Sequence, residues 1–192
     1  MKTSPKALVA LVRVFMAFVV ISIGSIGFMH SANADEDPKV EILKRLPLIY
    51  RTTLPDDHPA VVRARAALAD AYTALALEGE PQIDLWARRI WGWSGYESSF
   101  YTDPKGSNDK GAAVGVCQVH QPELYVAGIT AAMVRKDRVL GYRVCYRVMK
   151  KLIVSCKSVK RGLGAFATDG ACHDWIPTLV LARCKSIGDV CE

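Results

Sequence analysis

Glu97 is the side chain whose place in the sequence best suits acid–base chemistry. It continues an apolar stripe on an expected helix, formed at steps of three and four residues by Ile83, Trp86, Ile90 and Trp93. A carboxyl group among such side chains loses solvation, which favours its protonated form. A carboxylic acid that stays protonated can donate a proton to a leaving oxygen. The alternative is a helix-end carboxylate that lies in solvent or pairs with Arg88 or Arg89.

Glu97 also begins the first of two short motifs. Glu97-Ser98-Ser99-Phe100 is followed, after a polar loop, by Gly111-Ala112-Ala113-Val114-Gly115-Val116-Cys117-Gln118-Val119. In order and spacing the pair resembles the E-S-x-F and G-A-x-G-x-x-Q-[IV] motifs of soluble-type (SLT) lytic transglycosylases, a branch of the lysozyme-like superfamily that includes goose-type lysozymes. This chain has one extra residue between Ala112 and Gly115. The resemblance extends over roughly residues 82–185, and residues 137–142 look like the family's helix behind the cleft.

The resemblance implies cleavage of peptidoglycan glycan strands at the β-1,4 bond between N-acetylmuramic acid and N-acetylglucosamine. In this family one glutamate, here Glu97, protonates the glycosidic oxygen while the neighbouring N-acetyl group relieves the positive charge at the sugar. The same carboxylate then takes a proton from the C6 hydroxyl of muramic acid, which closes a 1,6-anhydro ring. This chemistry departs from the usual two-carboxylate rule, and the resemblance implies no metal and no organic cofactor.

Further binding residues follow from the same resemblance. Ser98 corresponds to a family serine near the acid, where it could bond substrate or Glu97, although a serine at a helix end also bonds backbone carbonyls. Gln118 corresponds to the family glutamine that faces the sugar, and its amide offers both a donor and an acceptor. The backbone of Val116 is expected to face the glycan, whereas Phe100 is expected to pack.

The third family motif, A-x-Y-N-x-G, is changed in this chain. Residues 165–170 read Ala-Phe-Ala-Thr-Asp-Gly, without the tyrosine that points at the catalytic glutamate. The residues that could take its place are Thr168, Asp169, Tyr142 and Tyr146. The change also leaves room for a water-activating carboxylate, which would make the enzyme an inverting muramidase. The candidates for that role are Asp169, Asp103 and Asp109.

Two other classes of function stay open at this point. Cys117 with His120 or His173 could form the nucleophile and base of a cysteine peptidase. The chain could also bind the cell wall without catalysis on the same scaffold, because a fold does not establish a function.

The expected elements are mostly helical. Helices are predicted at 61–77, from Pro81 to about Glu97, at 133–159 as one helix or two, and at 176–185. A β-prone run at 114–119 lies between them. The fold class is therefore α+β, mostly α, with one lysozyme-like domain at 35–192 and a small β region beside the cleft. On the stripe, Trp86 and Trp93 are expected in the core, and Trp91 is the better surface candidate.

The amino terminus has the pattern of a secretory signal at residues 1–34. Lys2 and Lys6 precede 16 uncharged residues at 14–29, and Ala32 and Ala34 form an Ala-x-Ala cleavage site. The alternative is a membrane anchor, for which the uncharged run is slightly short. We therefore expect an exported protein, periplasmic or associated with the cell envelope, that meets the membrane only through an uncleaved signal.

Six cysteines follow that segment, at positions 117, 145, 156, 172, 184 and 191. An even number after an export signal predicts up to three disulfides, and the sequence does not choose among the pairings. No two cysteines are closer than seven positions, which argues against a structural zinc.

The charge is concentrated in the middle of the chain. Residues 105–161 hold twelve basic and three acidic side chains, in a protein whose formal net charge is +6. Such a segment is either a solvated helix face or a surface that attracts an anionic polymer. For an exported protein, a cell wall with carboxylates is a better partner than nucleic acid, and a partner in the envelope or a secretion machine is also compatible with this sequence.

Overall fold

The computed structural model describes residues 37–104, 112–168, 170–188 and 191. The chain divides into two units, Met1–Asp35 and Glu36–Glu192, and every described residue belongs to the second. The predicted signal at 1–34 lies outside the described residues. Within the described ranges we find no helix with the length and apolar character needed to cross a bilayer.

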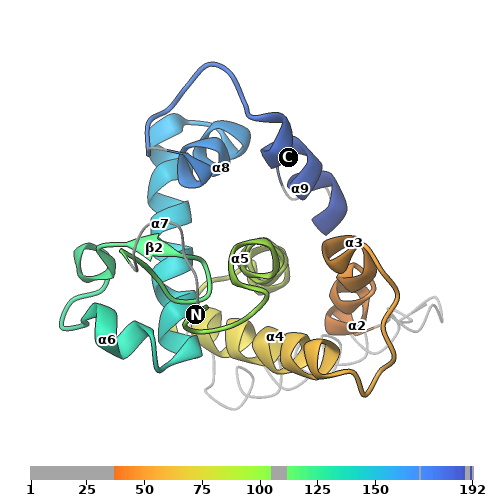
Figure 1. The fold of residues 1–192 in the computed structure, drawn as a ribbon. Helices are drawn as coiled ribbons and strands as arrows, with labels where there is room; N and C mark the ends of the chain where they lie inside the picture. The colour runs from red at the N-terminus through yellow and green to blue at the C-terminus, as the bar shows by residue number, and fades with distance from the viewer. Residues whose placement is uncertain (1–36, 105–111, 169, 189–190, 192) are drawn as a thin grey trace, which may run out of the picture. The chain divides into compact units, whose positions relative to one another are not determined.

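The described unit is mostly helical with one small antiparallel sheet, as the sequence predicted (Figure 1). The helices before the sheet are α2 (Pro38–Leu43), α3 (Leu46–Tyr50), α4 (Pro59–Leu77) and α5 (Ile83–Ser98). The sheet pairs β1 (Ala113–Val114) with β2 (Val119–His120). The helices after it are η1 (Pro122–Leu124), α6 (Ala131–Val134), α7 (Arg138–Cys156), α8 (Val159–Ala167) and α9 (Thr178–Ile187).

Local signals divide the predicted basic helical region into separate helices. The Asp137 carboxylate accepts a hydrogen bond from the Leu140 amide at 3.0 Å and begins α7. Lys157 adopts a left-handed conformation, with φ of 51°, and ends that helix. The Ser158 hydroxyl then accepts from the Arg161 amide and begins α8. The helical region predicted at 133–159 therefore consists mainly of α7, and α8 begins at its last residue.

Helix α5 is the central helix of this unit. Figure 1 shows it nearly end-on, with α4, α7, α3 and α9 around it. Most of its residues from Trp86 to Ser98 are buried, so the helix has no single apolar stripe but is covered on nearly all sides. Trp86 and Trp93 lie in the core, as predicted.

The prediction that Trp91 lies at the surface was wrong, because α5 is covered on the face opposite the stripe as well. Trp91 is fully buried, its indole donates to the Ala64 carbonyl at 2.9 Å, and its ring stacks on Phe100. Phe100 packs in the core, as the sequence predicted. Among the four tryptophans the exposed one is Trp175, in the segment between α8 and α9.

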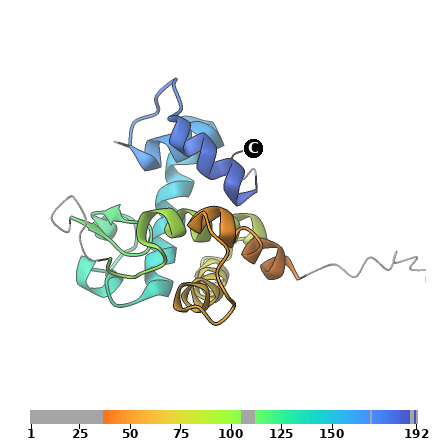
Figure 2. The ribbon, with the colours of Figure 1, turned by 45° about the vertical axis from the view of Figure 1, so that its right-hand side comes forward.

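Helix α8 lies against the second half of α7. A Cβ atom at Gly162 would come within 2.5 Å of the Ile153 backbone, so the glycine permits this close approach. The close approach of α8 to α7 therefore depends on the absence of a side chain at this position. In Figure 2, α8 and α9 lie side by side at the end of α7 farther from α6.

All six cysteines form disulfides, as predicted, and the structure gives the pairing. Cys117 bonds Cys145, which joins the β1–β2 segment to α7. Cys156, the last residue of α7, bonds Cys172 in the segment that follows α8. Cys184 in α9 bonds Cys191, which follows that helix. Three disulfides are typical of proteins that fold in an oxidising compartment. Because the Cys117 sulfur is bonded, it is not a thiol nucleophile, and the cysteine-peptidase hypothesis loses its central residue.

Two buried carboxylates at the end of α4 pair with cations of α7. Glu78 accepts from Nε of Arg143 and Nε of Arg147, each at 2.7 Å. Glu80 accepts from Lys150 at 3.0 Å and from the Tyr146 hydroxyl. Burial raises the pKa of each carboxyl, but these hydrogen bonds and positive charges outweigh burial and lower both pKa values below the ordinary 4.5.

These carboxylates predict a loss of stability in acid. A carboxyl group whose pKa is lower when folded stabilises the protein above its unfolded pKa, and this contribution disappears as the pH falls through the folded pKa. We therefore expect the urea midpoint to decline as the pH falls below about 4.5. Glu78→Gln should reduce this pH dependence, whereas Glu41→Gln, at a largely exposed ion pair, should leave it unchanged. If the urea midpoint depended on pH in the same way in the unchanged protein, in Glu78→Gln and in Glu41→Gln, the role of Glu78 would be contradicted.

Candidate functional site

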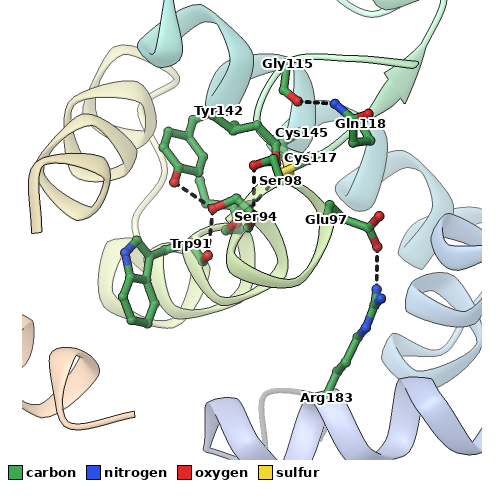
Figure 3. The surroundings of a disulfide bond; sticks show 12 residues. Trp91, Ser94, Glu97, Ser98, Gly115, Cys117, Gln118, Tyr142, Cys145 and Arg183 are labelled. Carbon is green, nitrogen blue, oxygen red and sulfur yellow. Dashed lines mark hydrogen bonds and ion pairs between the residues drawn. A yellow bond between two sulfur atoms is a disulfide. The ribbon is translucent and has the colours of Figure 1, made fainter. Parts of the chain in front are cut away.

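Glu97 lies in the last turn of α5, and its main partner is a cation from α9. Arg183 donates from Nη1 to Oε1 of Glu97 (Figure 3). The Glu97 side chain is 25% exposed and that of Arg183 is 13% exposed. The carboxylate is therefore accessible from one side and held by a guanidinium on another. The two alternative partners from the sequence bind elsewhere, because Arg88 donates to the Gly188 carbonyl and Arg89 lies over the Trp86 ring.

Arg183 itself is held by the aromatic side chains of α5. Its guanidinium carbon lies 5.4 Å from the centre of the Trp93 ring and 5.1 Å from that of Tyr96. The Tyr96 hydroxyl also shares a hydrogen bond with Ser186, one turn further along α9. Trp93, which the sequence placed on the same stripe as Glu97, thus lies against Arg183, the partner of Glu97. Sequence reasoning missed Arg183, which is 86 positions away and carries no local motif.

Ser98 connects α5 to the glycine–glutamine segment. Its hydroxyl is 3.0 Å from the Ser94 carbonyl and 2.7 Å from the Val116 carbonyl. The side chain is buried and bonds backbone oxygens, which matches the structural alternative considered for it. The Val116 carbonyl is used in the same bond, and the Val116 side chain is buried beside Gly141. Ser98 therefore fixes the position of the segment relative to the helix end that carries Glu97.

Gln118 lies in a tight turn between β1 and β2. Gly115 has a φ of +74° and its Cα faces Val134 so closely that a Cβ would lie 2.6 Å from that side chain. The Gln118 amide donates to the Gly115 carbonyl at 2.9 Å, and its backbone also has a positive φ of 51°. Figure 3 shows Gln118 and Glu97 on the same side of the α5 terminus. The second motif therefore forms a rigid turn that presents a partly exposed amide.

A cleft of about 620 Å³ runs between this turn and the α7–α8 pair. Gln118, His120 and Tyr125 line one side of it. The residues from α7, α8 and the following segment are Val148, Lys151, Leu152, Ser155, Ala165, Phe166, Thr168 and Gly170. Glu97 is not among the lining residues. Its helix is linked to the cleft by Phe166, which packs edge-on against Trp93 one turn before Glu97.

The residues proposed to replace the family tyrosine are widely separated. Tyr142 is fully buried and shares a 2.7 Å hydrogen bond with Ser94, and burial strongly raises its pKa. Tyr146 donates to Glu80, away from Glu97. Thr168 lines the cleft and donates to the Gly164 carbonyl at 3.0 Å, while Asp169 lies outside the described residues. Of these candidates, Thr168 is placed to meet a ligand in the cleft.

The carboxylates considered for a hydrolytic mechanism have no common site in the described residues. Asp103 pairs with Arg135 at 2.7 Å, and Asp109 lies outside the described ranges, as does Gly111 of the second motif. Across the part of the chain that is described, no three His, Cys, Asp or Glu side chains are grouped to hold a metal ion.

Comparisons of this chain with protein-family models, with curated protein sequences and with solved structures find no match. The functional interpretation therefore depends on the two motifs and on the geometry around Glu97.

Proposed function

We propose that this chain is an exported lytic transglycosylase with a lysozyme-like fold, which cleaves peptidoglycan glycan strands with Glu97 as its single acid and base. The observation that carries the proposal is the link between the two motifs. Ser98, the residue after Glu97, bonds the Val116 carbonyl within the turn that presents Gln118. This bond holds the candidate sugar-binding amide in a fixed relation to the helix end that carries the acid, and the amide lines a cleft large enough for a ligand.

The proposed reaction starts when protonated Glu97 donates its proton to the glycosidic oxygen and the C1–O bond breaks. The N-acetyl group of the muramic acid stabilises the positive charge at C1. The Glu97 carboxylate then accepts the C6 hydroxyl proton, and the C6 oxygen bonds C1 to form the 1,6-anhydro ring. Glu97 ends the cycle protonated, so no water is consumed.

Arg183 adds a requirement to this cycle. Its guanidinium donates to one oxygen of the Glu97 carboxyl group. Glu97 has to exchange this partner for the substrate oxygen before it can act as a donor. The exposed quarter of the Glu97 side chain gives the substrate a direction of approach. Once Glu97 is a carboxylate, Arg183 can stabilise it until it takes up the second proton.

Export and binding in the cleft complete the proposal. The signal pattern at 1–34 and the three disulfides fit a periplasmic or envelope location. Gln118 and Thr168 are the proposed contacts to the acetamido sugars, because both line the cleft.

Mass spectrometry of digested peptidoglycan tests this function. The full chain, produced with its disulfides, is incubated with purified sacculi and the soluble products are analysed. Products that end in 1,6-anhydromuramic acid support the transglycosylase. Reducing ends would indicate a muramidase instead, and an intact glycan would remove both activities.

A wall-binding protein without catalysis is the second candidate, and the Glu97–Arg183 pair favours it. A carboxylate that is already ion-paired is equally suited to fasten α9 to α5. Under this hypothesis the chain would bind sacculi without releasing soluble fragments, and Glu97→Gln would bind them as well as the unchanged protein does.

A further inference from the structure

The cations of α7 differ in what they bind. Helix α7 carries five basic side chains, and four of them pair with carboxylates from α4 or the segment after it. These four are Arg138 with Asp70, Arg143 and Arg147 with Glu78, and Lys150 with Glu80. Lys151 has no carboxylate within ion-pair distance among the described residues, and its side chain lines the cleft. Lys151 thus brings a positive charge to the wall of the cleft, at its border with a second hollow that it shares with Glu78 and Lys150.

An aromatic ring lies against this ammonium group. Lys151 Nζ lies 5.3 Å from the centre of the Tyr125 ring, a cation–π contact. Tyr125 is itself fixed, because Arg147, one turn earlier on α7, donates from Nη1 to its carbonyl at 3.1 Å. The ring covers one side of the ammonium group, and within the described ranges its N–H donors have no hydrogen-bond acceptor. Ser155, one turn further along α7, lines the same cleft with a hydroxyl.

We infer that Lys151, assisted by Ser155, forms a carboxylate-binding subsite in the cleft. An ammonium group and a hydroxyl one helical turn apart can both donate to the oxygens of one carboxylate. The inference rests on the proposed function for the nature of the ligand, a wall glycan. Its carboxylates come from the lactyl group of muramic acid where the peptide has been removed, or from the stem peptide where it remains. Lys151 would thus select acidic glycans over neutral ones.

Binding to three glycans of similar length tests the subsite. They are strands with stem peptides, strands whose peptides were removed by an amidase, and a chito-oligosaccharide without carboxylates. All are measured against the full chain carrying Glu97→Gln, so that cleavage does not interfere. Lys151→Gln is added to this background, with Lys151→Arg as the conservative variant. Lys160→Gln, an exposed cation in the first turn of α8 that does not line the cleft, is the matched control.

Lys151→Gln should weaken binding of an acidic strand about three- to tenfold, with a smaller loss at high salt, as expected for a partly screened ion pair. Binding of the chito-oligosaccharide should not change, Lys151→Arg should keep most of the affinity, and Lys160→Gln should keep all of it. A loss confined to peptide-bearing strands identifies the stem peptide as the source of the carboxylate. A loss confined to amidase-treated strands identifies the lactyl group.

The subsite is refuted if Lys151→Gln binds the acidic strands as tightly as its parent does, if it loses the neutral glycan equally, or if no acidic strand binds the parent. The proposed function fails separately, when the unchanged protein releases no anhydro products. A protein without anhydro products but with the Lys151 effect would be an acidic-glycan binder. One with anhydro products and no Lys151 effect would be a transglycosylase without this subsite.

Discussion

Glu97→Gln is expected to abolish glycan cleavage while the protein stays folded. The amide cannot donate the acid's proton or accept one from the C6 hydroxyl, so both proton transfers are lost. A general acid or base contributes about 100- to 10,000-fold to a rate, and we expect a loss of at least 100-fold. The amide oxygen can still accept from Arg183, so α9 keeps its contact with α5. Release of soluble fragments from sacculi measures the rate, and circular dichroism checks the fold.

The matched control for this substitution is Asp84→Asn. Asp84 lies in the first turn of the same helix and accepts a hydrogen bond from the Tyr72 hydroxyl at 2.7 Å. Asp84→Asn removes one negative charge from α5, as Glu97→Gln does, but at the opposite end of the helix. We expect its rate to match that of the unchanged protein. If Glu97→Gln cleaved glycan as fast as Asp84→Asn, the acid would be a different residue.

The sequence located Glu97 at the end of a helix but did not reveal its surroundings. Periodicity identifies one apolar face, and here it placed Trp86 and Trp93 correctly in the core. It misplaced Trp91, because α5 is covered on its other faces by elements distant in the sequence. Arg183 was missed for the same reason, since an ion pair between α5 and α9 depends on tertiary packing.

The basic segment shows a second limit of sequence reasoning. The charge count within residues 105–161 left open a solvated helix face or a surface that attracts an anionic polymer. The carboxylates that neutralise most of the α7 cations come from α4 and its end, at Asp70, Glu78 and Glu80. A local charge count does not include such partners. The α7 cation without such a partner among the described residues is Lys151, which lines the cleft and is a more specific feature than a basic helix face.

The sequence indicated a β-prone run at 114–119, but residues 115–118 form a turn between two short strands. The positive φ of Gly115 is a local property that favours glycine, whereas the Val134 side chain that leaves no room for a Cβ comes from α6. The bond from Ser98 to Val116 and the disulfide from Cys117 to Cys145 could not be predicted in the same way. Fifteen pairings of six cysteines are compatible with one sequence.

Removing the Cys117–Cys145 disulfide is expected to reduce the free energy of unfolding more than removing either of the other two disulfides. We propose Cys117→Ala together with Cys145→Ala, since both sulfurs are buried and alanine adds no polar group. The bond closes a loop with a sequence separation of 28, for which the chain-entropy relation gives about 3 to 4 kcal/mol. The free energy of unfolding, from urea titration followed by tryptophan fluorescence, should fall by this order. The double variant of Cys184 and Cys191, with a separation of 7, should lose about 2 kcal/mol.

The same pair of variants separates stability from the geometry of the site. Cys117 lies between Val116, which accepts from Ser98, and Gln118, which lines the cleft. Cys184 and Cys191 lie outside the cleft lining, so their removal should leave binding in the cleft intact. At a temperature where both variants are folded, glycan binding should therefore weaken only without the Cys117–Cys145 bond. Equal binding by the two variants would mean that Ser98 and Gly115 hold the turn in place without the disulfide.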